Sequence, residues 1–230
     1  GYPDDLIREV WRQISSFAGY SFSKAHSASF AVESFQSLYL KTHFPLEFMT
    51  AVINNFGGFY RTWVYFNEAR RQGARIHLPC VNRSEFKTVI QGRDIFIGFI
   101  HIQNLEHRFS EMLIDERESN GEYRSLEDFL ERVPVGLEQV VILIRINSLR
   151  LTGKSKKELL WDAHLILGSR KEKELMRELF PVRKRDFVLP ELEQTALENA
   201  YDELELLGCA VSVTRVQLLV GTVGRQRGAG

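Results

Sequence analysis

The first 73 residues carry apolar side chains at the spacing of an α-helix. Between residues 4 and 17 they recur every three or four positions, at Leu6, Val10, Ile14 and Phe17. This period predicts a helix with one apolar face. The same period predicts three further helices, over residues 23–42, 45–56 and 60–72. In the helix over residues 45–56 we expect Ile53 and Phe56 to be buried, with the glycines after Phe56 ending the helix.

Residues 74–98 change to a shorter period. Two runs rich in β-branched and aromatic residues, 86–90 and 95–98, are separated by the turn Gln91-Gly92-Arg93. Such runs on either side of a glycine-containing turn favour a β-hairpin. We therefore expect a small hairpin inserted in an otherwise helical chain.

Helical periodicity returns at about residue 106 and continues to residue 207. We expect helices over residues 106–120, 125–132, 136–147, 154–167, 169–180 and 191–207, with a break at Gly168. The last stretch, Val211 to Val223, has the composition of a strand, and residues 224–230 are expected to fray. The pattern as a whole predicts a mainly α protein.

Composition narrows the class of protein. A hydrophobic content of 44% and a charged content of 26% are typical of a soluble globular protein. No apolar run approaches the roughly 18 residues of a membrane helix, so we expect no membrane partner. Cys80 and Cys209 lie far apart and form no disulfide framework, which favours a reducing cytoplasm.

The formal net charge is zero, which argues against a simple nucleic-acid coat protein. Charge is nevertheless uneven, because residues 150–185 are rich in Lys and Arg whereas residues 191–205 are acidic. The simplest interpretation of such runs is that they form solvated helix faces.

The start of the second predicted helix is a candidate anion site. Ser23 is a good N-cap, and Lys24, His26 and Ser27 follow in or beside the first turn. Backbone N–H groups at a helix N-terminus are unpaired and the helix dipole is positive there, so phosphate is a natural ligand. The alternative is a capped surface helix whose Lys and His are merely solvated.

The same region resembles a known family. The stretch from Phe17 to Phe30, followed by Leu40-Lys-Thr-His-Phe-Pro-Leu-Glu-Phe48, is similar to the end of the fingers of bacterial C-family replicative polymerases, the DNA polymerase III alpha subunit. Ser23 replaces the more usual Asn. Gly73 to Ser84 and Glu205 to Ser212 are also similar to phrases of that family. The resemblance implies that Lys24, His26 and Ser27 contact phosphates of the incoming nucleotide or template.

Residues 99–160 resemble the tandem helix-hairpin-helix region of the same family, which implies binding to the backbone of duplex DNA. The first hairpin, Ile102 to His107, lacks both usual glycines and carries Glu106, so we expect it to have lost much of its grip on phosphate. The second hairpin aligns over Leu143 to Lys156. Its implied DNA-binding residues are Asn147, Gly153, Lys154, Lys156 and Lys157. The alternative is a pair of packed helices with a basic, solvated tip.

The sequence contains no catalytic signature of its own. Nucleotidyl transfer needs two metal ions held by clustered carboxylates, but no D-x-D motif occurs. Gly153-Lys154-Ser155 is not a P-loop, because Ser148 stands at the position of the first glycine. No metal-binding spacing of His or Cys is present either. The resemblance therefore implies a non-catalytic fragment of a Mg²⁺-dependent, DNA-directed DNA polymerase, a nucleotidyltransferase of the bacterial cytoplasm.

The implied partners are a DNA primer-template and deoxynucleoside triphosphates. Other replisome subunits, including a sliding clamp, would bind through regions outside this chain. The expected divisions are residues 1–73 for the fingers, 74–98 for a connecting segment with short strands, 99–168 for the tandem hairpins, 169–212 for a basic then acidic helical linker, and 213–230 for the start of a following domain or a tail. The alternative function is a helical protein-interaction adaptor that docks partners around Trp63 and Phe66.

Overall fold

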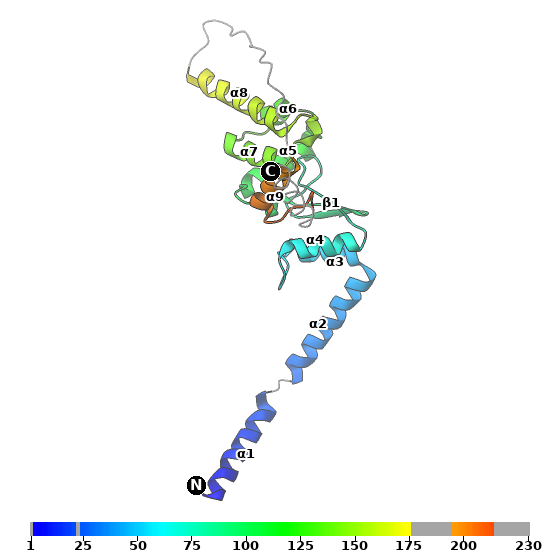
Figure 1. The fold of residues 1–230 in the computed structure, drawn as a ribbon, viewed down its shortest axis with the longest axis vertical. Coiled ribbons are helices and arrows are strands. Elements are labelled where there is room, and N and C mark those ends of the chain that lie inside the picture. Colours follow the sequence, from blue (N-terminus) through cyan, green and yellow to red (C-terminus); the bar gives the residue numbers. More distant parts are fainter. Residues whose placement is uncertain (1, 22–23, 176–194, 214–230) are drawn as a thin grey trace, which may run out of the picture. The chain divides into compact units, whose positions relative to one another are not determined.

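The computed structural model describes residues 2–21, 24–175 and 195–213 of the 230-residue chain (Figure 1). The chain divides into two compact units, residues 1–48 and residues 49–230. The described part is mostly helical and holds one small sheet, which confirms the predicted mainly α class.

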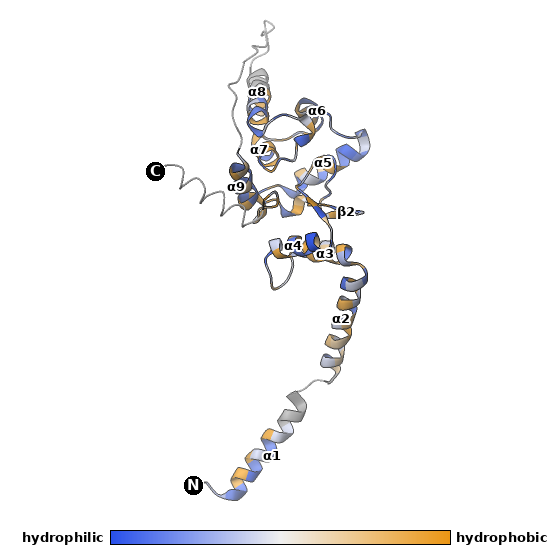
Figure 2. Cartoon of the chain, turned by 45° about the vertical axis from the view of Figure 1, so that its right-hand side comes forward, coloured by the Kyte–Doolittle hydropathy of each residue, from blue (hydrophilic) through white to orange (hydrophobic). Residues whose placement is uncertain are grey.

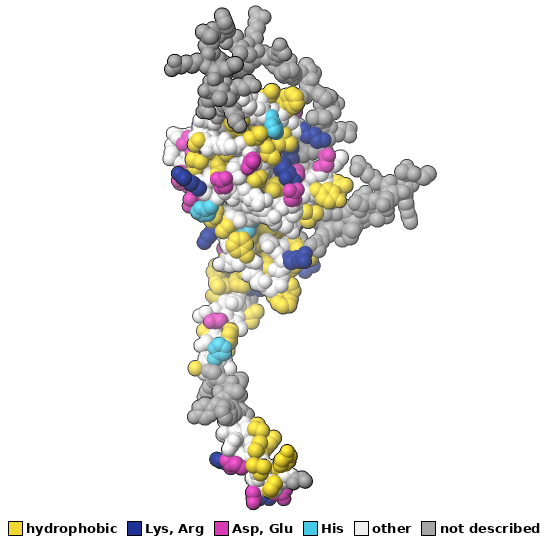
Figure 3. Space-filling view, turned by 90° about the vertical axis from the view of Figure 1, so that its left-hand side faces the viewer, with side chains coloured by type: hydrophobic (Ala, Val, Ile, Leu, Met, Phe, Trp, Pro, Cys, Tyr) yellow, Lys and Arg dark blue, Asp and Glu magenta, His cyan; other side chains and the backbone are white. Residues whose placement is uncertain are grey.

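The first unit consists of α1 (Asp4–Ser21), α2 (Lys24–His43) and the opening residues of α3 (Pro45–Asn54). The prediction of one continuous helix over most of 23–42 is confirmed by α2. Its expected cap, Ser23, lies outside the described residues. α1 runs past the predicted end at Phe17 and includes Gly19. Hydrophobic side chains gather along α1 (Figures 2 and 3), and Trp11, for example, is 69% exposed.

The helix α3 ends two residues earlier than predicted. Asn54 is its last residue, and Phe56 adopts a left-handed backbone with φ of 60°. The Phe56 side chain is 60% exposed, so the expectation that it is buried is wrong, whereas Ile53 is fully buried as expected. The chain then turns through two glycines into α4 (Thr62–Arg71).

The sheet contains the predicted hairpin and one strand more. β2 (Val89–Gln91) pairs antiparallel with β3 (Asp94–Phe96), which confirms the hairpin. β1 (Arg75–His77) lies on the other side of β3 and runs parallel to it. Ile95 of the central strand is fully buried between its two neighbours. The parallel pairing was not predicted, because it joins segments that no local turn connects.

The remaining helices build the core of the second unit. They are η1 (Phe99–His101), α5 (His107–Asn120), α6 (Leu126–Arg132), α7 (Leu137–Arg145), η2 (Arg150–Thr152), α8 (Lys156–Leu175) and α9 (Ala196–Leu207). α8 continues through Gly168, so the predicted break there is wrong. An interior glycine costs only about 1 kcal/mol relative to alanine, and α8 tolerates it. Residues 176–194 and 214–223, where further elements were expected, lie outside the described residues.

A buried arginine fixes the loop that connects β1 to β2. Arg117 of α5 is 8% exposed and donates hydrogen bonds to the backbone oxygens of Val81 and Ser84 and to the carboxylate of Glu85. Two hydrogen bonds also join the Asn82 side chain to the backbone of Tyr123. These bonds hold residues 81–85 against α5 and the segment that follows it.

The acidic helix α9 is an integral part of this unit. A capping box starts it, formed by Thr195 and Glu198. Its buried carboxylate Glu203 accepts hydrogen bonds from the backbone N–H groups of Val211 and Ser212. The backbone oxygen of Leu206 accepts a hydrogen bond from the N–H of Gln103 in the first hairpin. Hence α9 packs on the hairpin region and does not act as a separate linker.

Candidate nucleic-acid interface

Both hairpins contain an asparagine in the left-handed conformation. Asn104, between η1 and α5, has φ of 62°, and Asn147, between α7 and η2, has φ of 61°. Asparagine and glycine are the residues that enter this region most readily. The usual glycines are therefore replaced by the side chain that best preserves a tight turn between helices. Gly153, with φ of 69°, supplies a third left-handed residue just before α8.

The first hairpin uses its own polar groups internally. The backbone N–H of Glu106 donates to Oε1 of Gln139 at 2.9 Å, and Nε2 of Gln139 donates to the backbone oxygen of Asn104 at 3.2 Å. Gln139 belongs to α7, so it ties this hairpin to the other helix pair. An amide that a phosphate would need is thus already occupied, and the Glu106 carboxylate adds negative charge beside it.

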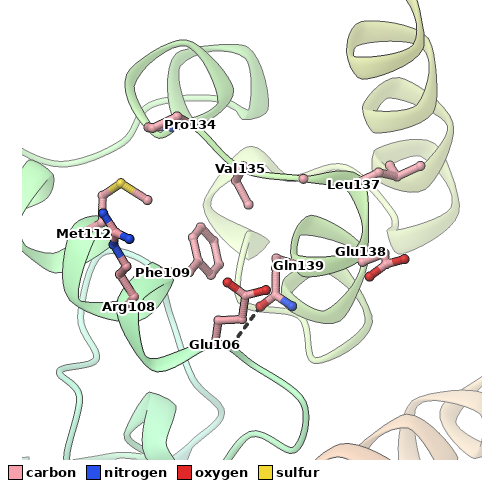
Figure 4. A pocket seen from close by; sticks show the side chains of 10 residues that line it. Glu106, Arg108, Phe109, Met112, Pro134, Val135, Leu137, Glu138 and Gln139 are labelled. Atoms are coloured by element: carbon pink, nitrogen blue, oxygen red, sulfur yellow. Dashed lines mark hydrogen bonds between the residues drawn. The ribbon is translucent and has the colours of Figure 1, made fainter. Parts of the chain in front are cut away.

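A cavity of about 500 Å³ lies beside the first hairpin, between the start of α5 and the α6–α7 connection (Figure 4). Arg108 and Gln139 line it together with the apolar side chains of Phe109 and Met112. α7 begins at its edge, where Gly136 is the N-cap and no side chain caps the helix. In the described part of the chain, Arg108 has no carboxylate partner.

The second hairpin is held rigidly from the side of the sheet. The Arg150 guanidinium donates to the backbone oxygens of Leu78, Pro79 and Asn147 at 2.8–3.1 Å. The N–H of Val81 donates to the backbone oxygen of Ser148 at 3.1 Å. A cross-linked turn of this kind presents its backbone in one fixed arrangement, which favours recognition of a regular ligand.

The three lysines after this hairpin each contact a carboxylate. Nζ of Lys154 lies 2.7 Å from Asp162 and 3.9 Å from Glu127. Nζ of Lys156 lies 3.1 Å from Asp202. The third, Lys157, lies 3.6 Å from a carboxylate oxygen of α9. The hydrogen bond with Asp162 raises the pKa of Lys154 above its ordinary value.

Exposure separates the first two of these lysines. The Lys154 side chain is 43% exposed, whereas that of Lys156 is 8% exposed. A solvent-facing ion pair is worth little, so an incoming phosphate can replace Asp162 at low cost. A buried lysine that loses its partner is far more costly. Lys154 is therefore the lysine of this hairpin that a ligand can reach, whereas Lys156 is buried and holds α8 to Asp202 of α9.

The N-terminus of α8 is already occupied by an acid. The N–H of Ser155 donates to Glu158 at 2.7 Å, and the N–H of Glu158 donates to Oγ of Ser155 at 3.2 Å. The Ser155 hydroxyl also donates to the Glu158 carboxylate at 2.7 Å, and this bond, together with the one from the Ser155 N–H, lowers the pKa of Glu158. A phosphate at this hairpin would consequently approach the exposed turn around Gly153 and Lys154, since the capped helix start has little room for a second anion.

Ion pairs between α7, α8 and α9 were missed by sequence reasoning. Arg145 of α7 forms ion pairs with Asp202 and Glu205 of α9, and the same Asp202 receives Lys156 of α8. The basic and acidic runs of the sequence therefore meet one another, and the expectation of purely solvated faces is wrong for these residues. The opposite charges of the two runs were the available signal, but their pairing depends on the fold.

The proposed phosphate residues of the first unit lie where the sequence placed them, in the first turn of α2. The described part of the structure includes the His26 ring, whose centroid is 4.5 Å from that of Phe30 with the planes perpendicular. Ser27 is half-buried. The Lys24 side chain lies outside the described residues.

The described residues contain neither a cluster of metal ligands nor a helix suited to a membrane. Within residues 2–21, 24–175 and 195–213, no group of three or more His, Cys, Asp or Glu side chains converges as metal ligands would. In that same portion, no helix combines the length and the apolar character that crossing a bilayer requires.

Comparison with known proteins gives one family match and many relatives. A helix-hairpin-helix motif family matches residues 73–159. The chain is 33% identical to an error-prone DNA polymerase of Mycobacterium tuberculosis, over 71% of this chain and 15% of that protein. It is 33% identical to DNA polymerase III subunit alpha of Thermus aquaticus, over 66% of this chain and 12% of that protein. The match to the same subunit of Aquifex aeolicus covers 92% of this chain and 18% of that protein, at 27% identity. The chain thus spans less than a fifth of the length of these relatives.

Proposed function

Because the chain belongs to the bacterial C-family DNA polymerases, we propose that it is a DNA-binding segment of a DNA-directed DNA polymerase. The observation that carries the proposal is the pair of left-handed asparagines, Asn104 and Asn147, at the two hairpins of the matched helix-hairpin-helix region. Turns of this kind bring backbone N–H groups close to a phosphate. The segment itself would hold DNA and catalyse nothing.

The second hairpin is the better candidate for the contact with duplex DNA. It offers Asn147, Gly153 and the exposed ammonium of Lys154, whereas the first hairpin has its amide at Glu106 occupied by Gln139. Contacts to the phosphate backbone fix a protein on the duplex without reading its sequence. Lys156 and Lys157 would support this surface by holding α9 in place.

The activity of the whole polymerase belongs to the same proposal. It would copy a DNA primer-template from deoxynucleoside triphosphates in the bacterial cytoplasm, with Lys24, His26 and Ser27 neutralising nucleotide or template phosphates. Carboxylates outside this chain would hold Mg²⁺, which stabilises the charge that develops on the transferred phosphoryl group. A sliding clamp and other replisome subunits would bind elsewhere on that protein.

The alternative function, a protein-interaction adaptor, is not supported at the surface suggested for it, because the residues expected to dock a partner are buried or partly buried. Phe66, around which the docking face was expected, is 3% exposed, and Trp63 is partly buried against the core. Those side chains stabilise the fold of the second unit and are not offered to a partner.

A salt titration with short duplex DNA tests the proposal. The intact chain should bind a fluorescein-labelled duplex with an affinity that falls with salt, and Lys154→Ala should weaken binding and reduce the log–log slope by about one unit. Lys87→Ala is the matched control, because Lys87 is also exposed and lies beside α5, outside the second hairpin. Equal binding by the Lys154→Ala and Lys87→Ala variants would show that the second hairpin is not the DNA surface.

A further inference from the structure

The turn between α3 and α4 exposes an unusual number of aromatic rings. Phe56, Phe59 and Tyr60 are 60%, 94% and 59% exposed. Phe59 is the most exposed of the large hydrophobic side chains in the described part of the chain. Exposed aromatic clusters on otherwise polar loops mark interaction sites. Arg61 follows directly and has no carboxylate partner among the described residues.

This turn has a defined conformation. The phenol oxygen of Tyr65 accepts hydrogen bonds from the N–H groups of Gly58 and Tyr60, at 3.0 and 3.3 Å. The N–H groups of Phe56 and Gly57 donate to the last turn of α3. The rings are therefore presented on a fixed frame, so a ligand that stacks on them pays little ordering entropy.

Phe56 occupies a strained position. Its φ of 60° places it at the helix end where glycine is the usual residue, and a residue with a Cβ atom is strained there. Much of the Phe56 ring is solvent-exposed, so burial repays only part of that strain. Strained residues that persist without a packing reason cluster at binding sites.

A cavity of about 250 Å³ opens beside Phe56. Its walls combine the Phe56 ring with His101, Thr62 and Gln103, and Phe66 and Leu207 form apolar parts of the lining. The His101 ring packs edge-on against Phe56, with centroids 5.4 Å apart. Its buried Nε2 has no hydrogen-bond partner among the residues that the structure describes. The cavity is thus a small space with apolar and polar walls, and one of its lining residues, His101, keeps its Nε2 buried.

The chemistry of this cavity selects a neutral, flat, polar ligand. Burial lowers the pKa of His101 to about 4, so the ring is neutral at physiological pH and does not attract phosphate into the cavity. A neutral imidazole instead exchanges a hydrogen bond with an amide or amino edge. Arg61 at the rim supplies the positive charge that a flanking phosphate needs. Aromatic platforms beside a cation are the recognition mode of single-stranded nucleic acid.

We propose that the α3–α4 turn and this cavity form a binding site for one unpaired nucleobase of single-stranded DNA. The base stacks on the Phe56 ring, and a rotation of the Phe56 side chain on its fixed backbone opens Nε2 of His101 to the polar edge of the base. Neighbouring bases stack on Phe59 and Tyr60, and the Arg61 guanidinium contacts a phosphate of the DNA backbone. The inference rests on the proposed function for the identity of the nucleic acid, but it uses different residues from the second hairpin.

The test uses a single-stranded oligonucleotide carrying 2-aminopurine, whose fluorescence falls when the base stacks. Phe56→Gly removes the ring and at the same time relieves the strained backbone, so a loss of binding by this variant is not explained by misfolding. It should weaken binding of the oligonucleotide about tenfold and abolish the quenching. Phe35→Ala, which removes a similarly exposed ring from α2, is the control and should bind as the parent does.

The outcomes separate this site from the proposed function. Loss of quenching in Phe56→Gly with unchanged duplex binding supports the base site. Equal quenching by the parent and Phe56→Gly, or no quenching by the parent, overturns it. Failure of the proposed function has a different signature, because it appears as duplex binding that is insensitive to Lys154→Ala.

Discussion

Asn104 and Asn147 adopt the same left-handed backbone conformation, with φ of 62° and 61°, at equivalent places in two successive hairpins. The backbone path of a helix-hairpin-helix repeat is therefore kept where its glycines are gone. The two turns differ in what surrounds them: Gln139 occupies the first, whereas the second stays open beside Lys154.

Asn147 is predicted to contribute to stability mainly through its backbone. No hydrogen bond from its side chain is present in the described structure, so Asn147→Ala tests the conformation alone. This variant should lower the free energy of unfolding by about 1 kcal/mol, because alanine enters the left-handed region less readily. Asn147→Gly should leave stability unchanged or raise it. Urea denaturation of the three proteins decides the point, and equal midpoints for the alanine and glycine variants would contradict it.

The hydroxyl of Ser148 is predicted to lower the stability of the folded chain. It is fully buried, and its hydroxyl has no hydrogen-bond partner in the described part of the chain. In contrast, the hydroxyl of the buried Ser110 donates to the backbone oxygen of His107 at 2.7 Å. Removing an unsatisfied polar group is neutral or stabilising, and removing a satisfied one costs about 1 kcal/mol. Thermal melts should thus rank Ser148→Ala at or above the parent and Ser110→Ala below it. The reverse order would show that Ser148 is bonded in solution.

Lys154 and Lys156 are predicted to have separate roles. Lys156→Ala removes a buried ammonium from Asp202, which keeps Arg145 as a partner. The free energy of unfolding should fall by about 1–3 kcal/mol. Lys154→Ala removes an exposed ion pair and should change stability by less than about 1 kcal/mol. Chemical denaturation of both variants at the same salt concentration checks this, and similar losses of stability in the two would refute the division.

His101 is predicted to make stability fall in mild acid. Burial lowers the pKa of His101 to about 4 in the folded chain, whereas an unfolded histidine titrates near 6.5. Between these values the unfolded state binds more protons, so stability rises with pH. Its contribution is full above about pH 6.5 and is lost as pH falls toward 4, by about 2–3 kcal/mol. His101→Gln should flatten this part of the pH profile, and an unchanged profile would mean that His101 protonates freely in the fold.

Helices and the hairpin were predictable because their signals are local. The apolar period found α2 and α4 to within two residues at each end, and the turn at Gly92 found the β2–β3 hairpin. The parallel partner β1 was missed because its pairing depends on the chain returning past intervening residues. The end of α3 was also misplaced, since Phe56 continues the apolar period but lies outside the helix.

The candidate site was only partly predictable. The position of Asn147 in a turn follows from its sequence context, and the structure bears out its left-handed backbone. The partners of the lysines do not follow from sequence, because Asp202 meets Lys156 and Arg145 only once α9 has packed on α7 and α8. The aromatic turn and the His101 cavity likewise combine residues from α4, the hairpin region and α9 that no motif links.

Mapping of backbone amide chemical shifts on addition of a short DNA duplex tests most directly whether the second hairpin holds DNA. The amides of Asn147, Gly153 and Lys154 should shift in proportion to bound duplex, and the shifts should diminish as salt is raised. The amide of Glu106, bonded to Gln139, should change less. Shifts confined to the first hairpin, or no shifts in either hairpin at low salt, would contradict the assignment of the second hairpin as the DNA-binding surface.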